Sequence, residues 1–114
     1  MNPTEKPLDQ PSDLKQYYRD HGVVDQYMGT RTQEPLNGVL HARQVQFLNR
    51  AIAERHPERV LEIACGPGRL TAEMRGVTNG VAMDASPAML ATARKRTQQT
   101  GQWSFLRGDA FVLP

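Results

Sequence analysis

The stretch VLEIACGPG, residues 60–68, decides the fold of this chain. The run from Arg59 to Ala64 is short, apolar and rich in branched side chains, which is typical of a strand buried on both faces. Gly66 and Gly68 allow a sharp turn and close approach of a ligand, and the next helix offers unpaired N–H groups. The stretch therefore predicts a buried parallel strand that ends in a glycine-rich turn.

Downstream of this turn, helix signals and strand signals alternate. Ser86 is the expected N-cap of one helix, with Pro87 at its first helical position. We predict, in chain order, a helix over 69–75, a strand over 80–84, a helix over 87–99 and a strand over 103–106. This alternation predicts an α/β fold with a parallel sheet and right-handed crossovers.

Upstream of the turn, the sequence predicts helices. Residues 1–13 are polar and contain prolines, so we expect a disordered tail there. Residues 14–57 form an expected helical segment, with a loop over 29–38 and a long helix over 39–55. The long helix is predicted to pack on the sheet through an apolar stripe that consists of Leu40, Val45, Leu48, Ala51 and Ile52. Residues 58–114 are the expected partial ligand-binding domain.

Composition and charge exclude several classes of protein. The chain has 114 residues, of which 39% are hydrophobic and 23% charged, which fits one small globular domain at most. The net charge of +2 comes from scattered charges of both signs, so no nucleic-acid partner is indicated. A single cysteine, Cys65, excludes an internal disulfide and favours the cytoplasm. No apolar run approaches the ~20 residues that cross a bilayer, so we expect no membrane partner.

The residues that follow each predicted strand are candidate binding residues, because ligands of open parallel sheets sit at the carboxyl ends of the strands. Asp84 ends the second strand, where a carboxylate can accept hydrogen bonds from a ribose diol. This pattern fits a dinucleotide or S-adenosylmethionine. The dinucleotide fingerprint requires Gly or Ala at position 71, where this chain has Thr71. Glu62 is a carboxylate suited to the cationic end of S-adenosylmethionine.

Three stretches resemble the signatures of class I S-adenosylmethionine-dependent methyltransferases. Residues 62–68, an acid followed by small residues and G-x-G, are similar to the first signature. Residues 80–90 are similar to the second signature, and residues 108–110 to the third. The resemblance covers residues 60–114 and implies a Rossmann-like parallel sheet with flanking helices, preceded by N-terminal helices. The sheet is expected to be incomplete, with three of the family's about seven strands, which leaves the first strand as an uncovered edge.

The resemblance also implies roles for individual residues. Asp84 takes the ribose hydroxyls, Asp109 meets the adenine amino group, and the next residue meets the ring edge. Tyr17, Tyr18 and Arg31 are candidates for covering the cofactor. The candidate cofactor-binding residues are Glu62, Ala64, Cys65, Gly66, Gly68, Asp84, Ala85, Met89, Gly108, Asp109 and Ala110. No metal ligand is predicted, and the catalytic residue stays unassigned. We interpret Cys65 as a packing residue and not as a nucleophile.

The resemblance implies transfer of a methyl group from S-adenosylmethionine to an acceptor that we expect to be a small molecule. We expect the chain to be part of a longer enzyme that alone binds the cofactor weakly and turns over nothing. Two alternatives stay open. One is a fragment of a nicotinamide-dependent oxidoreductase, which Thr71 disfavours, and the other is a non-catalytic Rossmann-like interaction module. The sequence indicates no oligomeric state.

Overall fold

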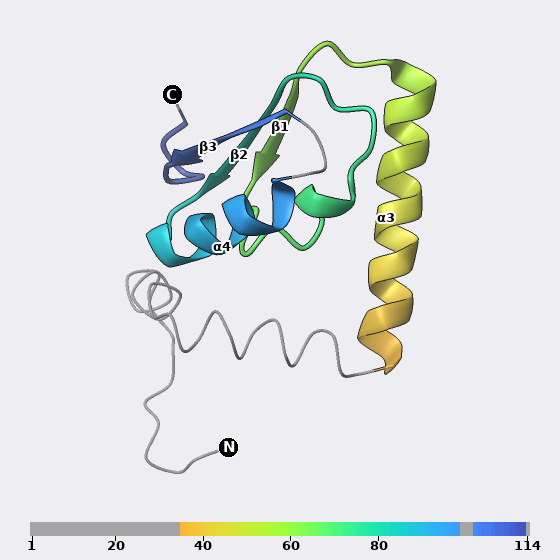
Figure 1. Cartoon of the computed structure of the whole chain (residues 1–114), viewed down its shortest axis with the longest axis horizontal. Coiled ribbons are helices and arrows are strands. Elements are labelled where there is room, and N and C mark those ends of the chain that lie inside the picture. The colour runs from red at the N-terminus through yellow and green to blue at the C-terminus, as the bar shows by residue number, and fades with distance from the viewer. Residues whose placement is uncertain (1–34, 99–101, 114) are drawn as a thin grey trace.

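The structure is a computed structural model that describes residues 35–98 and 102–113. Its elements are α3 (Pro35–Arg55), β1 (Val60–Ile63), the 3-10 turn η1 (Thr71–Glu73), β2 (Gly80–Asp84), α4 (Pro87–Thr97) and β3 (Trp103–Arg107) (Figure 1). The three strands form one parallel sheet in the order β1-β2-β3. The predicted α/β fold, with three parallel strands and flanking helices, is confirmed. The predictions for residues 1–34, including Tyr17, Tyr18 and Arg31, lie outside the described residues.

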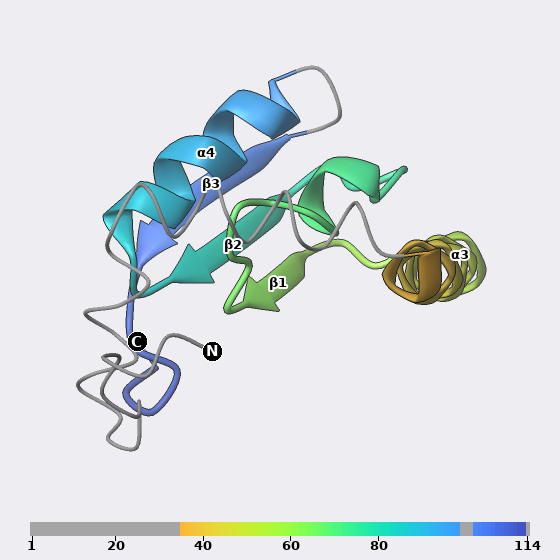
Figure 2. The same ribbon diagram turned by 90° about the horizontal axis from the view of Figure 1, so that it is seen from below.

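The core lies between the sheet and α4, which covers one face of the sheet (Figure 2). The strand register places Glu62 opposite Ala82 and Ala82 opposite Phe105, so these side chains share one face. Ala82 is at the centre and has no exposed surface. The cluster around it consists of Cys65, Ala82, Leu90 and Ala93, with Trp103 and Phe105 packed against it. A small three-stranded sheet thus obtains its core from a single helix.

The second face of the sheet is exposed at its two outer strands, although Met83 of the central strand is 1% exposed on that same face. Leu61 and Ile63 of β1 are 56% and 42% exposed, and Leu106 of β3 is 41% exposed. β1 is also an edge strand, as we expected. The prediction that the first strand is buried on both faces is therefore wrong for the described residues, because the cover that α4 provides lies on the other face.

α3 differs from the prediction in where it begins and in what it contacts. It begins at Pro35, so residues 35–38 of the predicted loop are helical. Proline is tolerated in the first turn of a helix because the N–H groups of that turn have no acceptor within the helix, so the missing N–H of proline breaks no hydrogen bond. No side chain of α3 is buried, and Leu40 of the predicted stripe is 51% exposed. The prediction that this helix packs on the sheet is wrong: α3 stands beyond the β1 edge, with η1 between it and α4 (Figures 1 and 2).

Polar contacts join α3 to the segment that contains η1. The side-chain Nδ2 of Asn49 donates to the carbonyl of Glu73 at 3.0 Å, and its Oδ1 accepts from the backbone N–H of Arg75 at 2.8 Å. Gly76 follows with φ +76°, and a Cβ there would lie 3.7 Å from Cγ2 of Ile52. One asparagine thus pairs with the backbone on both sides of Met74.

The remaining elements fall close to their predicted positions. Ser86 caps α4 as predicted, since its Oγ accepts a hydrogen bond from the N–H of Met89 at 3.2 Å. α4 ends two residues earlier than predicted, and β3 extends one residue further, to Arg107. The predicted helix over 69–75 is only the single turn η1, because Met74 is extended, with φ −75° and ψ 125°.

Candidate cofactor site

The loop after β1 has a backbone that few side chains adopt. Ala64 and Gly66 both have φ +57°, and Gly68 has φ +82°. The N–H of Cys65 donates to the carbonyl of Met83 at 2.9 Å, and the N–H of Gly68 donates to the carbonyl of Cys65 at 3.2 Å. These bonds continue the pairing of β1 with β2 and then close a tight turn. The loop is the sharp connection that the sequence predicts, and it leads into η1.

The two glycines of this loop do different things. A Cβ on Gly68 would lie 2.9 Å from Cα and 3.1 Å from Cβ of Ala93, so its hydrogen lets the loop lie directly against α4. A Cβ on Gly66 would meet no described atom within 4 Å. Gly68 is therefore needed for packing, whereas Gly66 borders open space that a ligand can approach.

Asp84, the last residue of β2, is directed at the glycine loop. Its Oδ2 accepts from the N–H of Gly66 at 2.9 Å, and its Oδ1 accepts from the N–H of Ser86 at 2.9 Å. A carboxylate oxygen has two lone-pair sites, so each oxygen can accept a further hydrogen bond. The structure thus joins Asp84 to Gly66 as the predicted site requires, while the ribose-binding role stays a prediction.

Glu62 is the second carboxylate beside this loop, on the same face of the sheet as Asp84. The hydroxyl of Thr71 donates to its Oε2. Burial raises the pKa of Glu62, while the Thr71 hydrogen bond and the charge of Arg69 oppose that rise. The site therefore contains a partly buried acid whose ionised form gains from any further cation.

Cys65 is a packing residue at the base of this site. Its side chain belongs to the core cluster, and the residue is 6% exposed. Burial, with the charges of Asp84 and Glu62, raises the pKa of its thiol to about 12. A thiol with this pKa is protonated at neutral pH and is a poor nucleophile. This agrees with the packing role that the sequence predicts.

Backbone contacts bring the third predicted segment, after β3, to the end of β2. The N–H of Gly108 donates to the carbonyl of Asp84 at 3.1 Å, and a Cβ on Gly108 would lie 2.6 Å from Sδ of Met83. Asp109 Oδ1 accepts from the N–H of Phe111 at 2.9 Å, which forms a turn. Ala110 is exposed. The adenine-binding roles of these residues stay predictions.

Ala85 and Met89 lie around the beginning of α4. Met89 is 3% exposed and packs with Ala88, so its side chain fills space inside the protein. Ala85 is partly exposed next to the Asp84 carboxylate. The structure therefore brings the predicted residues together around the ends of the strands, although it gives Met89 a packing role and leaves its predicted contact with the cofactor untested.

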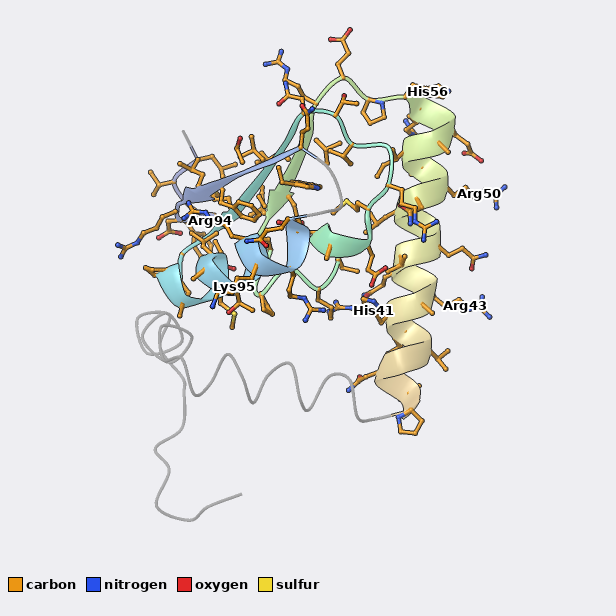
Figure 3. All side chains as sticks on the ribbon, in the orientation of Figure 1. His41, Arg43, Arg50, His56, Arg94 and Lys95 are labelled. Carbon is orange, nitrogen blue, oxygen red and sulfur yellow. The ribbon has the colours of Figure 1, made fainter. Side chains whose placement is uncertain are left out.

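A polar network that the sequence did not predict lies beside Glu62. The Nη1 atom of Arg69 donates to Nδ1 of His41 at 2.7 Å and to Oε1 of Gln44 at 2.9 Å. Figure 3 shows His41 on the side of α3 that faces the sheet, whereas Arg43 points away. Arg69 and His41 are 28 positions apart, and no local pattern links residues so distant. Only the position of α3 could reveal this contact.

Residues 35–98 and 102–113, which the structure describes, show neither a cluster of metal ligands nor a membrane-spanning helix. These residues contain no group of three or more His, Cys, Asp or Glu side chains placed to hold a metal ion. They also contain no helix that combines the length and the apolar character needed to cross a membrane.

Comparison with known proteins identifies the fold. The structure is similar to magnesium protoporphyrin IX methyltransferase from Synechocystis PCC 6803 with bound SAM, with a TM-score of 0.72, 19% identity, and 97% of this chain and 60% of that chain covered. With bound SAH, that enzyme gives a TM-score of 0.71, 18% identity, and coverage of 90% and 53%. The sugar N-methyltransferase KedS8 from Streptoalloteichus sp ATCC 53650 gives a TM-score of 0.56, 24% identity, and coverage of 79% and 34%. No curated protein matches the chain.

The arrangement of the described elements is thus the fold of the class I methyltransferases, present in part. Residues 60–114 match the family model described as a methyltransferase domain. The chain spans 60% or less of the length of these similar structures.

Proposed function

We propose that this chain binds S-adenosylmethionine at the glycine loop and serves methyl transfer to a small-molecule acceptor. One observation carries the proposal: the Asp84 carboxylate is held by the N–H groups of Gly66 and Ser86. It lies where ligands of open parallel sheets bind, at the carboxyl ends of the strands. The match of residues 60–114 to the methyltransferase domain supports this assignment.

The residues around the loop fit the groups of this cofactor. A ribose diol needs paired acceptors, and the two oxygens of Asp84 supply them. The amino group of the methionine end needs a carboxylate, and Glu62 is on the same face of the sheet. The space beside Gly66 permits close approach of the ligand. When bound, the cofactor supplies an electrophilic methyl group on a sulfonium, while the chain binds and orients it.

The choice of a small-molecule acceptor is supported by the proteins that share the fold. Two of them are named for a magnesium porphyrin and for a sugar. The chain corresponds to 60% or less of those structures, and we propose that it supplies the cofactor-binding part of the activity. We assign no catalytic base among the described residues. We also place this activity in the cytoplasm, which the single cysteine supports.

Calorimetry with S-adenosylhomocysteine tests the proposal. We expect the wild-type chain to bind it and Asp84→Asn to bind about tenfold to a hundredfold more weakly, because a neutral amide is a weaker acceptor for two hydroxyls. The amide keeps one oxygen, which can accept from the N–H of Gly66 or of Ser86 but not from both. Glu54→Gln is the matched control, since it removes a carboxylate that is 63% exposed on α3, and it should leave binding unchanged.

Three results of these binding measurements would contradict the proposal. Equal affinity of Asp84→Asn and wild type would remove the ribose assignment. Binding of NAD in place of S-adenosylhomocysteine would indicate the oxidoreductase alternative. A folded wild-type chain that binds neither ligand would indicate a non-catalytic module.

A further inference from the structure

We propose that Thr71 is a positioning residue that holds the Glu62 carboxylate ready for the amino group of the cofactor. This inference rests on the proposed function. The hydroxyl of Thr71 donates to Oε2 of Glu62, and Thr71 has no exposed surface. A side chain without exposed surface cannot touch a ligand itself, so any effect of its hydroxyl on binding passes through Glu62.

The hydrogen bond does two things for Glu62. It fixes one carboxylate oxygen, so the other, Oε1, is presented to a ligand in a defined direction and less conformational freedom is lost on binding. It also favours the ionised form: burial raises the pKa of Glu62, and the Thr71 hydroxyl lowers it toward its ordinary value. An ammonium group on the ligand requires this ionised form.

The neighbouring cation, Arg69, does not occupy the position beside Glu62 that the amino group of the cofactor would take. The positive charge of Arg69 lowers the pKa of Glu62. The Nη1 of Arg69, however, donates hydrogen bonds to His41 and Gln44 of α3. Among the described residues, no ion pair joins Arg69 to Glu62. Figure 3 shows His41 on the sheet-facing side of α3, from which it reaches this guanidinium. Glu62 is therefore held by a neutral hydroxyl while the cation beside it has other partners.

The Thr71 hydroxyl takes no part in the hydrogen bond that closes η1. The backbone bond that closes η1 runs from the N–H of Met74 to the carbonyl of Thr71 at 3.4 Å. Position 71 is also where a dinucleotide fingerprint has Gly or Ala, which have no hydroxyl. The backbone at position 71 therefore does not need the hydroxyl to form its turn. The hydroxyl of Thr71 acts instead through its hydrogen bond to Glu62.

Calorimetry on the full chain with two ligands tests the inference. S-adenosylhomocysteine has the amino acid end, whereas 5′-methylthioadenosine has the nucleoside and thioether without it. We expect Thr71→Val to weaken S-adenosylhomocysteine about tenfold and to leave 5′-methylthioadenosine within about twofold. Thr71→Ser, which keeps the hydroxyl, should restore binding. Thr97→Val is the matched control, because it removes a similarly buried hydroxyl that donates to Ala93 in α4, and both affinities should persist.

Two further measurements exclude a merely structural role. If Thr71 acts through Glu62, Thr71→Val combined with Glu62→Gln should bind S-adenosylhomocysteine no more weakly than Glu62→Gln alone. Loss of the hydroxyl should also raise the pKa of Glu62 further, so binding of this ligand to Thr71→Val should begin to weaken at a higher pH as the solution is acidified.

The outcomes separate this inference from the proposed function. Suppose that the wild type binds both ligands. If Thr71→Val then weakens the binding of both ligands equally, or weakens neither, the positioning role is wrong and the proposed function stands. Additive effects of Thr71→Val and Glu62→Gln would also overturn it. If the folded wild type binds neither ligand, the proposed function fails and this inference fails with it.

Discussion

Glu62 lies where the charged form of its carboxyl group is disfavoured. Burial is the largest influence on its pKa and raises it, and the Thr71 hydroxyl and Arg69 offset only part of that rise. Removal of an ionised carboxylate from water destabilises the folded state unless a cation compensates it. In the protein without ligand, ionised Glu62 therefore lowers the free energy of unfolding, and a ligand with an ammonium group would recover that loss.

The raised pKa of Glu62 makes the stability of the fold depend on pH. A carboxyl whose pKa is raised in the folded state stabilises the fold at pH below its ordinary value of 4.5, and this stabilisation is lost as pH rises through the raised pKa. Glu62→Gln should therefore unfold at a higher temperature than wild type at about pH 7, and the difference should shrink toward about pH 4. Thermal unfolding at both pH values measures this.

Glu54→Gln is the control for that experiment, because its side chain is 63% exposed and pairs on the surface with Arg50. It should change the unfolding temperature little at either pH. A wild type more stable than Glu62→Gln at neutral pH, without ligand, would contradict the account of Glu62.

At the scale of elements, the contact between the loop and α4 depends on a missing side chain. Gly68 combines φ +82° with a backbone approach so close that a Cβ added there would lie 2.9 Å from Cα of Ala93. By contrast, Gly38 lies inside α3, where a Cβ would meet nothing within 4 Å. The same substitution should therefore have opposite effects in these two elements.

Gly68→Ala should destabilise the protein by about 2–4 kcal/mol, from left-handed backbone strain and overpacking together. Gly38→Ala should stabilise it by about 0.5–1 kcal/mol, because alanine loses less conformational entropy in a helix. Urea denaturation of both variants measures the two free energies of unfolding. A stable Gly68→Ala variant would show that the loop does not lie against α4 as described.

At the scale of the whole molecule, the protein divides into a core and an attached helix. The core is formed by the sheet and α4, whereas α3 contributes no buried side chain. Asn49 joins α3 to the backbone of Glu73 and Arg75 by two hydrogen bonds. Because α3 is held by few contacts and adds nothing to the core, it can open locally while the sheet and α4 stay folded.

Asn49→Ala should therefore increase amide hydrogen exchange in α3, while the amides of β2 and α4 keep their protection. Hydrogen exchange followed by mass spectrometry measures both regions at once. Arg50→Ala is the control on the same helix, because its ion pair with Glu54 is exposed and contributes little. Equal loss of protection in α3 and α4 would contradict this division of the molecule.

The sequence by itself determined the order of the three strands and of α4 after residue 59, the glycine loop and the cap of α4. These features depend on short-range signals: a run of branched residues, glycines at positive φ, and Ser86 before Pro87. The meeting of Asp84 with Gly66 followed as well, because parallel strands bring their carboxyl ends to one edge of the sheet.

Only the tertiary structure decided how α3 is attached, which face of β1 is covered, and which partners hold Glu62 and Arg69. An apolar stripe indicates that a helix has a partner without saying which one, and Leu40 is exposed despite belonging to it. Side-chain contacts such as Arg69 with His41 join residues far apart in the chain. Their formation depends on how whole elements are placed, which no local pattern of residues contains.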